Sequence, residues 1–172
     1  MSAFTIRPED TADHAAIHAL TAKAFAGQPQ SDGNEPRIVD ELRESGDLVL
    51  SLVAEDAERI VGHIAFSPVT ISDGSKRWFA LGPVSVKPDL QRTGIGNALI
   101  LRGIARMRQD GANGIVLLGD PDYYARFGFE HDPELRYPGP EPRYFQCLVL
   151  SGEPPRGKVS FPAAFGTNEA SR

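Results

Sequence analysis

The chain contains a single cysteine, Cys147, among its 172 residues. One thiol cannot close a disulfide within the chain, and it cannot supply a zinc site built from several cysteines. A chain that uses no disulfide is typical of a reducing compartment, so we expect a cytoplasmic location. His14 and His18 stand four residues apart, a spacing that can hold a metal on one helix face. No third ligand accompanies this pair, and we expect no metal site.

Long apolar runs and an excess of positive charge are also missing. The longest apolar stretches, residues 48–54 and 115–118, are much shorter than the roughly 20 residues that cross a bilayer. Asp10 and Asp13 interrupt the segment in which a signal peptide would need a continuous apolar run. The formal net charge of -5 argues against non-specific binding of nucleic acid. We therefore expect neither a membrane partner nor a nucleic-acid partner.

The chain does contain the alternating short strands and helices of one α/β or α+β domain, and its length is typical of a single domain. The strand–helix–strand order between residues 78 and 118 favours a parallel pair of strands within one mixed sheet. Apolar periodicity and turn residues predict helices that begin after residues 10 and 34, a helix from about residue 95 to 109, a short helix at 123–127, and strands at 4–7, 48–54, 60–71, 78–86, 115–118 and 145–150.

The composition changes after residue 151, where glycine, proline and charged residues become frequent. We therefore divide the chain into a folded domain at residues 1–151 and a C-terminal tail at residues 152–172. Phe161 and Phe165 give the tail apolar side chains, so we expect it to pack back on the domain.

The most informative segment is a glycine-containing turn, residues 91–97, which follows the strand at 78–86 and opens a helix. The first backbone amides of a helix have no partner within it and lie at the positive end of the helix dipole. Together they form an anion site that suits phosphate. Gly94 and Gly96 allow an oxygen atom to approach the backbone closely, and Arg92 adds a positive charge.

Two other phosphate-binding motifs fit this turn poorly. A Walker A loop ends in Gly-Lys-Ser or Gly-Lys-Thr, whereas Asn97 and Ala98 follow Gly96. A dinucleotide fingerprint needs glycine or alanine at the position of Leu99, although Asp120 stands where a ribose-binding acid is expected. A nicotinamide-dinucleotide site therefore stays open as an alternative, as does a tight turn that binds no ligand.

Three segments resemble the GNAT superfamily of N-acetyltransferases. Residues 91–96, Gln-Arg-Thr-Gly-Ile-Gly, resemble its (Gln/Arg)-x-x-Gly-x-(Gly/Ala) motif, and residues 82–88 resemble its central strand. Residues 119–129 resemble a bacterial subgroup of predicted acetyltransferases that carries Gly-Asp-Pro-x-Tyr-Tyr-x-Arg-Phe-Gly-Phe. The resemblance covers roughly residues 3–151. It implies a mixed, mostly antiparallel sheet with a splayed central parallel strand pair, flanked by helices.

The resemblance also implies where the cosubstrate acetyl-CoA binds. The amides of the turn hold its diphosphate, the central strand pairs with its pantetheine arm, and the short helix lines its adenine end. The matching residues are Gln91, Arg92, Thr93, Gly94, Ile95, Gly96 and Asn97 for the diphosphate, Val84, Ser85 and Val86 for the pantetheine, and Tyr123, Arg126 and Phe127 for the adenine.

Acetyl transfer to an amine needs a deprotonated nucleophile, a polarised thioester carbonyl and a stabilised thiolate leaving group. Tyr124 matches the general-acid tyrosine of the family, and a phenol with an ordinary pKa of about 10 keeps its proton at neutral pH. Tyr123 has the same chemistry, but one step along a helix turns it about 100° away. We therefore predict Tyr124 as the catalytic acid and a backbone N–H near Val84 as the group that polarises the carbonyl.

The base that accepts the amine proton has several candidates. Many relatives carry a glutamate on the central strand, whereas residues 78–86 contain no acidic side chain. Glu35, at the start of the second helix, and His63, on the strand before the turn, are the candidate substrate-binding residues and bases. Ser85 acting through a chain of waters is a further candidate.

These features predict an acetyl-CoA-dependent N-acetyltransferase. The acceptor is expected to be a primary amine, on a small molecule or a peptide, that attacks directly in a ternary complex. The alternative is a non-catalytic acyl-CoA-binding sensor or interaction module, which the missing strand carboxylate favours and Tyr124 disfavours. Sheets of this family often pair through edge strands and tails, so a homodimer is a further expectation.

Overall fold

The computed structural model of the protein describes residues 3–166, so residues 167–172 of the predicted tail lie outside the described residues. The chain forms two compact units. The first contains the residues up to Phe66 together with Gly82–Ala105, and the second contains Ser67–Leu81 together with the residues from Arg106 onward. The chain therefore crosses between the units within one strand, β5 (Trp78–Val86), and within one helix, α3 (Ile95–Gln109).

The sheet of the first unit has the strand order β1-β2-β3-β5. It consists of β1 (Thr5–Pro8), β2 (Leu50–Asp56), most of β3 (Arg59–Pro68) and the last part of β5. The antiparallel register of β2 and β3 places Val53 opposite His63, and Ala54 opposite Gly62. Since successive side chains of a strand point to opposite faces, Val53 and His63 share one face of the sheet, and Ala54 shares the other face with Gly62.

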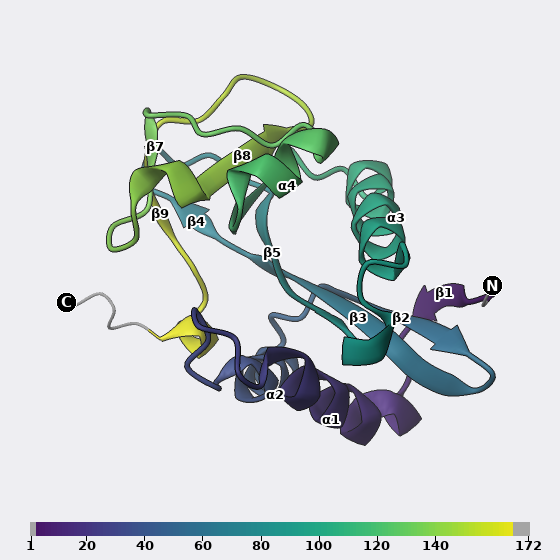
Figure 1. Cartoon of the computed structure of the whole chain (residues 1–172). Helices are drawn as coiled ribbons and strands as arrows, with labels where there is room; N and C mark the ends of the chain where they lie inside the picture. Colours follow the sequence, from purple (N-terminus) through teal and green to yellow (C-terminus); the bar gives the residue numbers. More distant parts are fainter. Residues whose placement is uncertain (1–2, 167–172) are drawn as a thin grey trace. The chain divides into compact units, whose positions relative to one another are not determined.

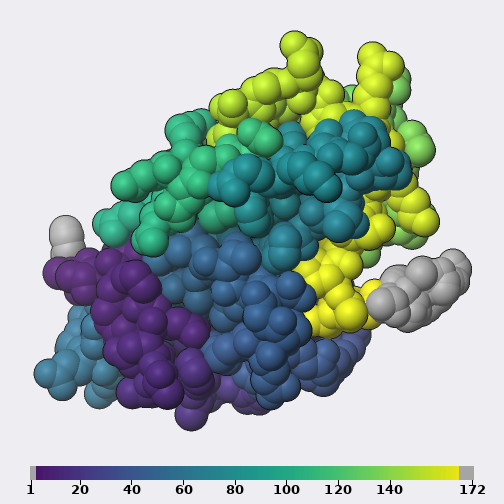
Figure 2. All heavy atoms as spheres, turned by 180° about the vertical axis from the view of Figure 1, so that it is seen from behind, coloured from purple at the N-terminus to yellow at the C-terminus, as the bar shows by residue number. Residues whose placement is uncertain are grey.

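Two helices cover the face that carries Val53. They are α1 (His14–Phe25), which follows the short 3-10 helix η1 (Thr11–Asp13), and α2 (Glu35–Ser45). Figure 1 shows α1 and α2 side by side, and the N-terminal residues through α1 are visible as purple spheres in Figure 2. Ile17 of α1 and Val39 of α2 pack with Val53 in one buried cluster. The apolar periodicity that predicted these two helices therefore includes residues that pack on the sheet.

Helix α3 covers the opposite face of this sheet. It follows the 3-10 helix η2 (Pro88–Leu90) and the glycine-containing turn. A Cβ atom at Gly62 would lie only 2.7 Å from Cγ2 of Ile95 and 2.9 Å from Cδ1 of Leu99. The absence of a side chain on β3 thus allows the first turn of α3 to press directly on the strand.

The second unit contains the parallel pair of the fold. The first part of β5 pairs in parallel with β6 (Gly114–Leu118), and β6 pairs antiparallel with β8 (Phe145–Val149). The parallel register covers Trp78–Ala80 with Gly114–Val116, while both strands continue beyond it. The short helices α4 (Pro121–Tyr124) and η3 (Ala125–Phe127) follow β6. The predicted mixed, mostly antiparallel sheet with one parallel pair and flanking helices is confirmed.

A small three-stranded sheet completes the second unit. It has the order β4-β9-β7, formed by β4 (Thr70–Ile71), β9 (Gly157–Ser160) and β7 (Leu135–Arg136). The segment 60–71, predicted as one strand with an irregularity at Pro68, is two strands, because β3 ends at Pro68 and β4 joins this separate sheet. The 3-10 helices η4 (Pro142–Tyr144) and η5 (Ala163–Phe165) precede β8 and follow β9.

Residues from the predicted tail take part in this second sheet. β9 pairs antiparallel with β4 and in parallel with β7, and Phe161 packs against the same apolar cluster as Tyr137. The cluster also buries Cys147, and burial raises the pKa of that thiol to about 11. The domain boundary at residues 151 and 152 stays a prediction. Within residues 3–166, no helix combines the length and the apolar character needed to cross a membrane.

Candidate functional site

The turn before α3 is exposed and has an unusual backbone. Arg92 has a φ of 67° and Gly94 a φ of 100°, both in the left-handed region that a residue with a side chain rarely adopts. The side-chain amide of Gln91 donates a hydrogen bond to the carbonyl of Val86 at 3.1 Å, and the Thr93 hydroxyl donates to the carbonyl of Leu90. These two hydrogen bonds hold the turn against the end of β5 and against η2.

This conformation leaves a row of backbone amides free. Among the described residues, none accepts a hydrogen bond from the backbone N–H groups of residues 92–96, and the Ala98 amide donates to the Gly94 carbonyl at 3.0 Å. The Arg92 guanidinium likewise has no hydrogen bond or ion pair with any residue in 3–166. Unpaired amides at the start of a helix, next to a free guanidinium, make a site of positive potential that suits a diphosphate.

The strand that leads into this turn carries a second polar feature. The Lys87 amide donates to the Val61 carbonyl at 2.9 Å, which joins the end of β5 to β3. Ser85 is 1% exposed, and its hydroxyl has no hydrogen-bond partner among the described residues. Val84 and Val86, on the other side of the strand, are half-buried.

His63 lies on the neighbouring strand, β3. His63 is 0% exposed, and its Nε2 lies 2.8 Å from the Ser51 hydroxyl. Its Nδ1 has no partner among the described residues.

The hydrogen bonds around Ser51 determine the tautomer of His63. Ser51 donates its single hydroxyl proton to Oε1 of Glu9 at 2.6 Å, and Arg43 forms an ion pair with the same carboxylate at 2.8 Å. The Ser51 oxygen must then accept from His63, so the imidazole proton sits on Nε2 and Nδ1 carries the lone pair. Burial lowers the pKa of His63 to about 4, which keeps the ring neutral at neutral pH.

Glu35 is the more accessible of the two predicted bases. It is the first residue of α2, where the positive end of the helix dipole favours a carboxylate. Its Oε1 accepts a hydrogen bond from the Ser31 hydroxyl at 2.7 Å, and Oε2 has no such partner in the described part of the chain. The side chain is half-buried, in contrast to the complete burial of His63.

In the second unit, α4 and η3 bring four of the predicted residues into one aromatic cluster. Asp120 caps α4 by accepting from the Asp122 amide at 3.0 Å. The cluster is held by edge-on ring contacts and by Arg126, whose guanidinium lies 4.5 Å from the Tyr123 ring centroid. Its members are Tyr123, Tyr124, Arg126 and Phe127.

Tyr123 and Tyr124 are both half-buried. The Tyr124 ring packs over Gly119, where a Cβ atom would come within 2.6 Å of Cε2, and lies edge-on to Phe129 at 6.0 Å between centroids. Burial raises the pKa of Tyr124 to about 12, and it also raises the pKa of Tyr123. The Tyr124 hydroxyl hydrogen-bonds to none of the residues in 3–166.

Sequence reasoning missed the groups that hold these residues in place. Glu9, Arg43 and Ser51 are distant in sequence from His63, and nothing in their local pattern links them. Gly62, and the packing role of Gly119 within its motif, were not predicted, because a glycine within or just after a strand gives no local indication of the side chain that packs on it. The sequence offers only the general indication that a glycine in a strand often marks a place where another part of the chain packs closely on the backbone.

Comparisons with known proteins agree on one family. A family model described as an acetyltransferase (GNAT) domain matches residues 5–131. The uncharacterized N-acetyltransferase YhbS of Escherichia coli strain K12 is 38% identical over 141 residues, which is 79% of this chain and 81% of that protein. The uncharacterized N-acetyltransferase YjhQ of the same strain is 33% identical over 142 residues, which is 81% of this chain and 77% of that protein.

Solved structures give the same result. A GNAT family acetyltransferase from Brucella melitensis, crystallised with acetyl-CoA, is similar to this chain with a TM-score of 0.85 and 45% identity, covering 96% of this chain and 99% of the other. The YhbS structure from Escherichia coli, in complex with CoA, has a TM-score of 0.88 and 32% identity, covering 96% of this chain and 93% of the other.

Proposed function

Because the chain belongs to the GNAT acetyltransferase family, we propose that it transfers the acetyl group of acetyl-CoA to a primary amine of a small molecule or peptide. The amine attacks the thioester directly while both substrates are bound, so no acetylated enzyme is formed. The observation that carries the proposal is the row of free amides at residues 92–96 beside the unpaired Arg92.

The proposed acetyl-CoA site follows from these groups. The amides of the turn and the Arg92 guanidinium bind the diphosphate, whose negatively charged oxygens accept hydrogen bonds from these donors. Val84, Ser85 and Val86 offer the end of β5 to the pantetheine arm, and Tyr123, Arg126 and Phe127 offer a stacking surface to the adenine. The Brucella melitensis relative was crystallised with acetyl-CoA, which supports this assignment.

Tyr124 is the proposed acid. Its pKa of about 12 means that the hydroxyl keeps its proton at neutral pH and donates a hydrogen bond to the departing thiolate. Its hydroxyl makes no competing hydrogen bond within the described residues, so the donor is free for the sulfur. A backbone N–H of β5 near Val84 polarises the thioester carbonyl as negative charge develops on its oxygen.

Glu35 is the proposed base. The amine reaches the enzyme as an ammonium ion and must lose a proton before it can attack. Glu35 has one carboxylate oxygen without a partner in the described part of the chain and is partly accessible, whereas His63 is completely buried and can act only through a water. A Glu35→Gln variant should lower kcat while leaving the KM for acetyl-CoA close to that of the wild type; a His63→Asn variant that loses more activity at equal stability would transfer the role to His63.

A thiol-release assay tests the proposed function as a whole. Acetyl-CoA is mixed with the protein and a panel of amines that includes diamines, amino sugars and peptides with free N-termini. Release of CoA that depends on one class of amine, together with the acetylated amine detected by mass spectrometry, supports the transferase. Binding of CoA with no transfer to any amine would favour an acyl-CoA sensor.

A further inference from the structure

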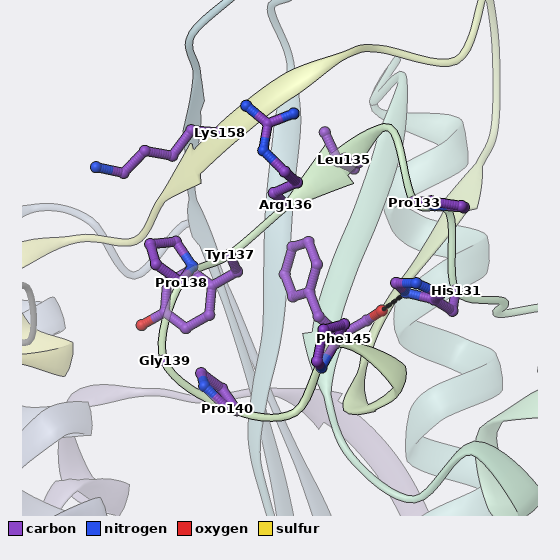
Figure 3. A pocket seen from close by; sticks show the side chains of 11 residues that line it. His131, Pro133, Leu135, Arg136, Tyr137, Pro138, Gly139, Pro140, Phe145 and Lys158 are labelled. Carbon is purple, nitrogen blue, oxygen red and sulfur yellow. Dashed lines mark hydrogen bonds between the residues drawn. The ribbon is translucent and has the colours of Figure 1, made fainter.

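A cavity of about 660 Å³ lies within the second unit, around the segment that joins β7 to β8 (Figure 3). This volume is in the range of sites that hold small organic ligands. The residues that line it come from β7 and the residues just before it, from β9, from the start of β8 and from the segment that joins β7 to β8. All of them belong to the second unit.

The floor and walls of the cavity are apolar and stiff. Phe145 is 3% exposed and stacks on Tyr137, with ring centroids 5.5 Å apart and an interplanar angle of 29°. Figure 3 shows the Phe145 ring between the segment that carries Tyr137 and the side that carries His131. Three prolines of the segment between β7 and β8 also line the cavity: Pro138, Pro140 and Pro142. Proline has a restricted φ and no amide hydrogen that needs a partner, so this part of the wall is stiff. Such walls are suited to a planar or aliphatic body.

The rim of the cavity carries two positive charges that folding does not explain. Arg136 of β7 and Lys158 of β9 are register partners in the parallel pair, so two like charges stand on neighbouring strands. Like charges at directly opposed positions destabilise a sheet. Both side chains are exposed, neither is paired with any residue in 3–166, and no carboxylate is among the described residues that line the cavity. An anion would relieve this repulsion.

His131 adds a hydrogen-bonding group on the other side of the cavity. Its Nδ1 lies 3.2 Å from the Phe145 carbonyl oxygen, which can only accept, so Nδ1 is the donor. In the neutral ring, Nε2 then carries the lone pair and can accept an N–H or O–H of a ligand. The cavity therefore combines two cationic groups, an aromatic floor and one acceptor.

We propose that this cavity binds a small organic anion, a carboxylate or phosphate ester attached to an aromatic or branched aliphatic body. Arg136 and Lys158 hold the anionic group, the body lies on Phe145 and Tyr137, and His131 accepts a hydrogen bond from the ligand. The inference depends on this unit alone and stands whether or not the acetyl-transfer proposal does.

Phenyl phosphate and phenylacetate are the probes, titrated into the full-length chain with inorganic phosphate as the comparison. Binding is followed by calorimetry and located by amide shifts in two-dimensional NMR. The expected result is that both phenyl probes bind more tightly than inorganic phosphate and shift the amides of His131, Arg136, Tyr137, Phe145 and Lys158. Shifts confined to residues 92–97, or no binding of either probe, would overturn the proposal.

Two paired variants separate this site from general electrostatic attraction. Arg136→Ala with Lys158→Ala should weaken phenyl phosphate binding by at least about tenfold. Lys23→Ala with Arg59→Ala removes the same total charge from exposed positions in the first unit. This control pair should change the affinity for phenyl phosphate by less than about twofold. Both pairs are exposed, and their unfolding temperatures are compared with the wild type first. Equal losses in the two pairs would contradict a site in the cavity.

Discussion

Tyr124 is a phenol whose proton is held more firmly than usual, because burial makes the phenolate costly and raises the pKa to about 12. The ring has its position because Gly119 leaves room for it and Phe129 meets its edge. The hydroxyl is thus a fixed hydrogen-bond donor over the whole physiological pH range. That property suits a group that stabilises a leaving thiolate.

Replacing Tyr124 with phenylalanine removes only this donor. We expect Tyr124→Phe to lower kcat by about 100-fold or more, since general acids contribute on this scale, with little change in the affinity for acetyl-CoA. Steady-state kinetics with a competent amine gives kcat, and calorimetry gives the affinity. Tyr123→Phe is the matched control and should affect kcat much less. Equal turnover in Tyr124→Phe and the wild type would remove Tyr124 from the mechanism.

His63 shows the opposite consequence of burial. Desolvation lowers its pKa to about 4, whereas an imidazole in the unfolded chain has a pKa of about 6.5. The unfolded chain therefore binds more protons than the folded chain between these two values. Stability from this residue is complete above pH 6.5 and is lost as the pH falls toward 4.

This difference predicts an acid-sensitive stability. Between pH 7 and pH 4, His63 should account for a loss of about 3 kcal/mol in the free energy of unfolding. Urea unfolding at a series of pH values measures it. A His63→Asn variant is less stable at pH 7 but should show a shallower pH dependence over this interval. An identical slope in both proteins would show that His63 is not the titrating group.

At the scale of elements, the position of α3 depends on contact between a strand and a helix. Gly62 of β3 lies under Ile95 and Leu99, the residues that begin α3, and Gly103 further along α3 lies over Phe66. Both glycines have ordinary backbone conformations, so their function is to allow close packing rather than an unusual φ. The contact at Gly62 therefore positions the turn that carries the free amides.

A Gly62→Ala substitution should push the first turn of α3 away from β3. The added methyl would meet Ile95 Cγ2 at 2.7 Å, so we expect a loss of about 1–3 kcal/mol of stability and a clear loss of acetyl-CoA affinity. Gly103→Ala is the comparison, because its methyl would meet Phe66 at 2.5 Å far from the turn. It should destabilise the protein similarly and leave the affinity closer to that of the wild type. Equal effects on affinity would contradict this role of Gly62.

At the scale of the whole molecule, a ligand that binds only the folded chain stabilises it. At a concentration 100 times its Kd, acetyl-CoA should add about 2.7 kcal/mol and raise the unfolding temperature by about 5–10 °C. Thermal unfolding with and without acetyl-CoA measures the shift. NAD and NADP are the comparison and should give no shift, since Leu99 occupies the third position of the dinucleotide fingerprint. A shift with NAD alone would favour the dinucleotide alternative.

Much of the proposed site is local in sequence, and that part was predictable. The turn at 91–97, the strand before it and the aromatic run at 123–127 each lie on the element expected for them. The segment 60–71 was predicted as one strand and is two strands, because the sequence does not show that residues 70 and 71 pair with a segment about ninety residues later. The short strands β7 and β9 have too few residues for a period to be read.

The sequence alone determined which chemical groups stand next to one another along the chain. A glycine-containing turn that leads into a helix leaves the first amides of that helix without a helical partner, whatever surrounds the turn. Tertiary structure decided which of these groups are buried and which partners they have. His63 is neutral because the folded chain buries it, and its proton is on Nε2 because Ser51, which comes from another strand, donates its own proton to Glu9. Arg136 and Lys158 stand together only because β9 returns to β7. Burial and long-range pairing are properties of the folded chain, and no local pattern encodes them.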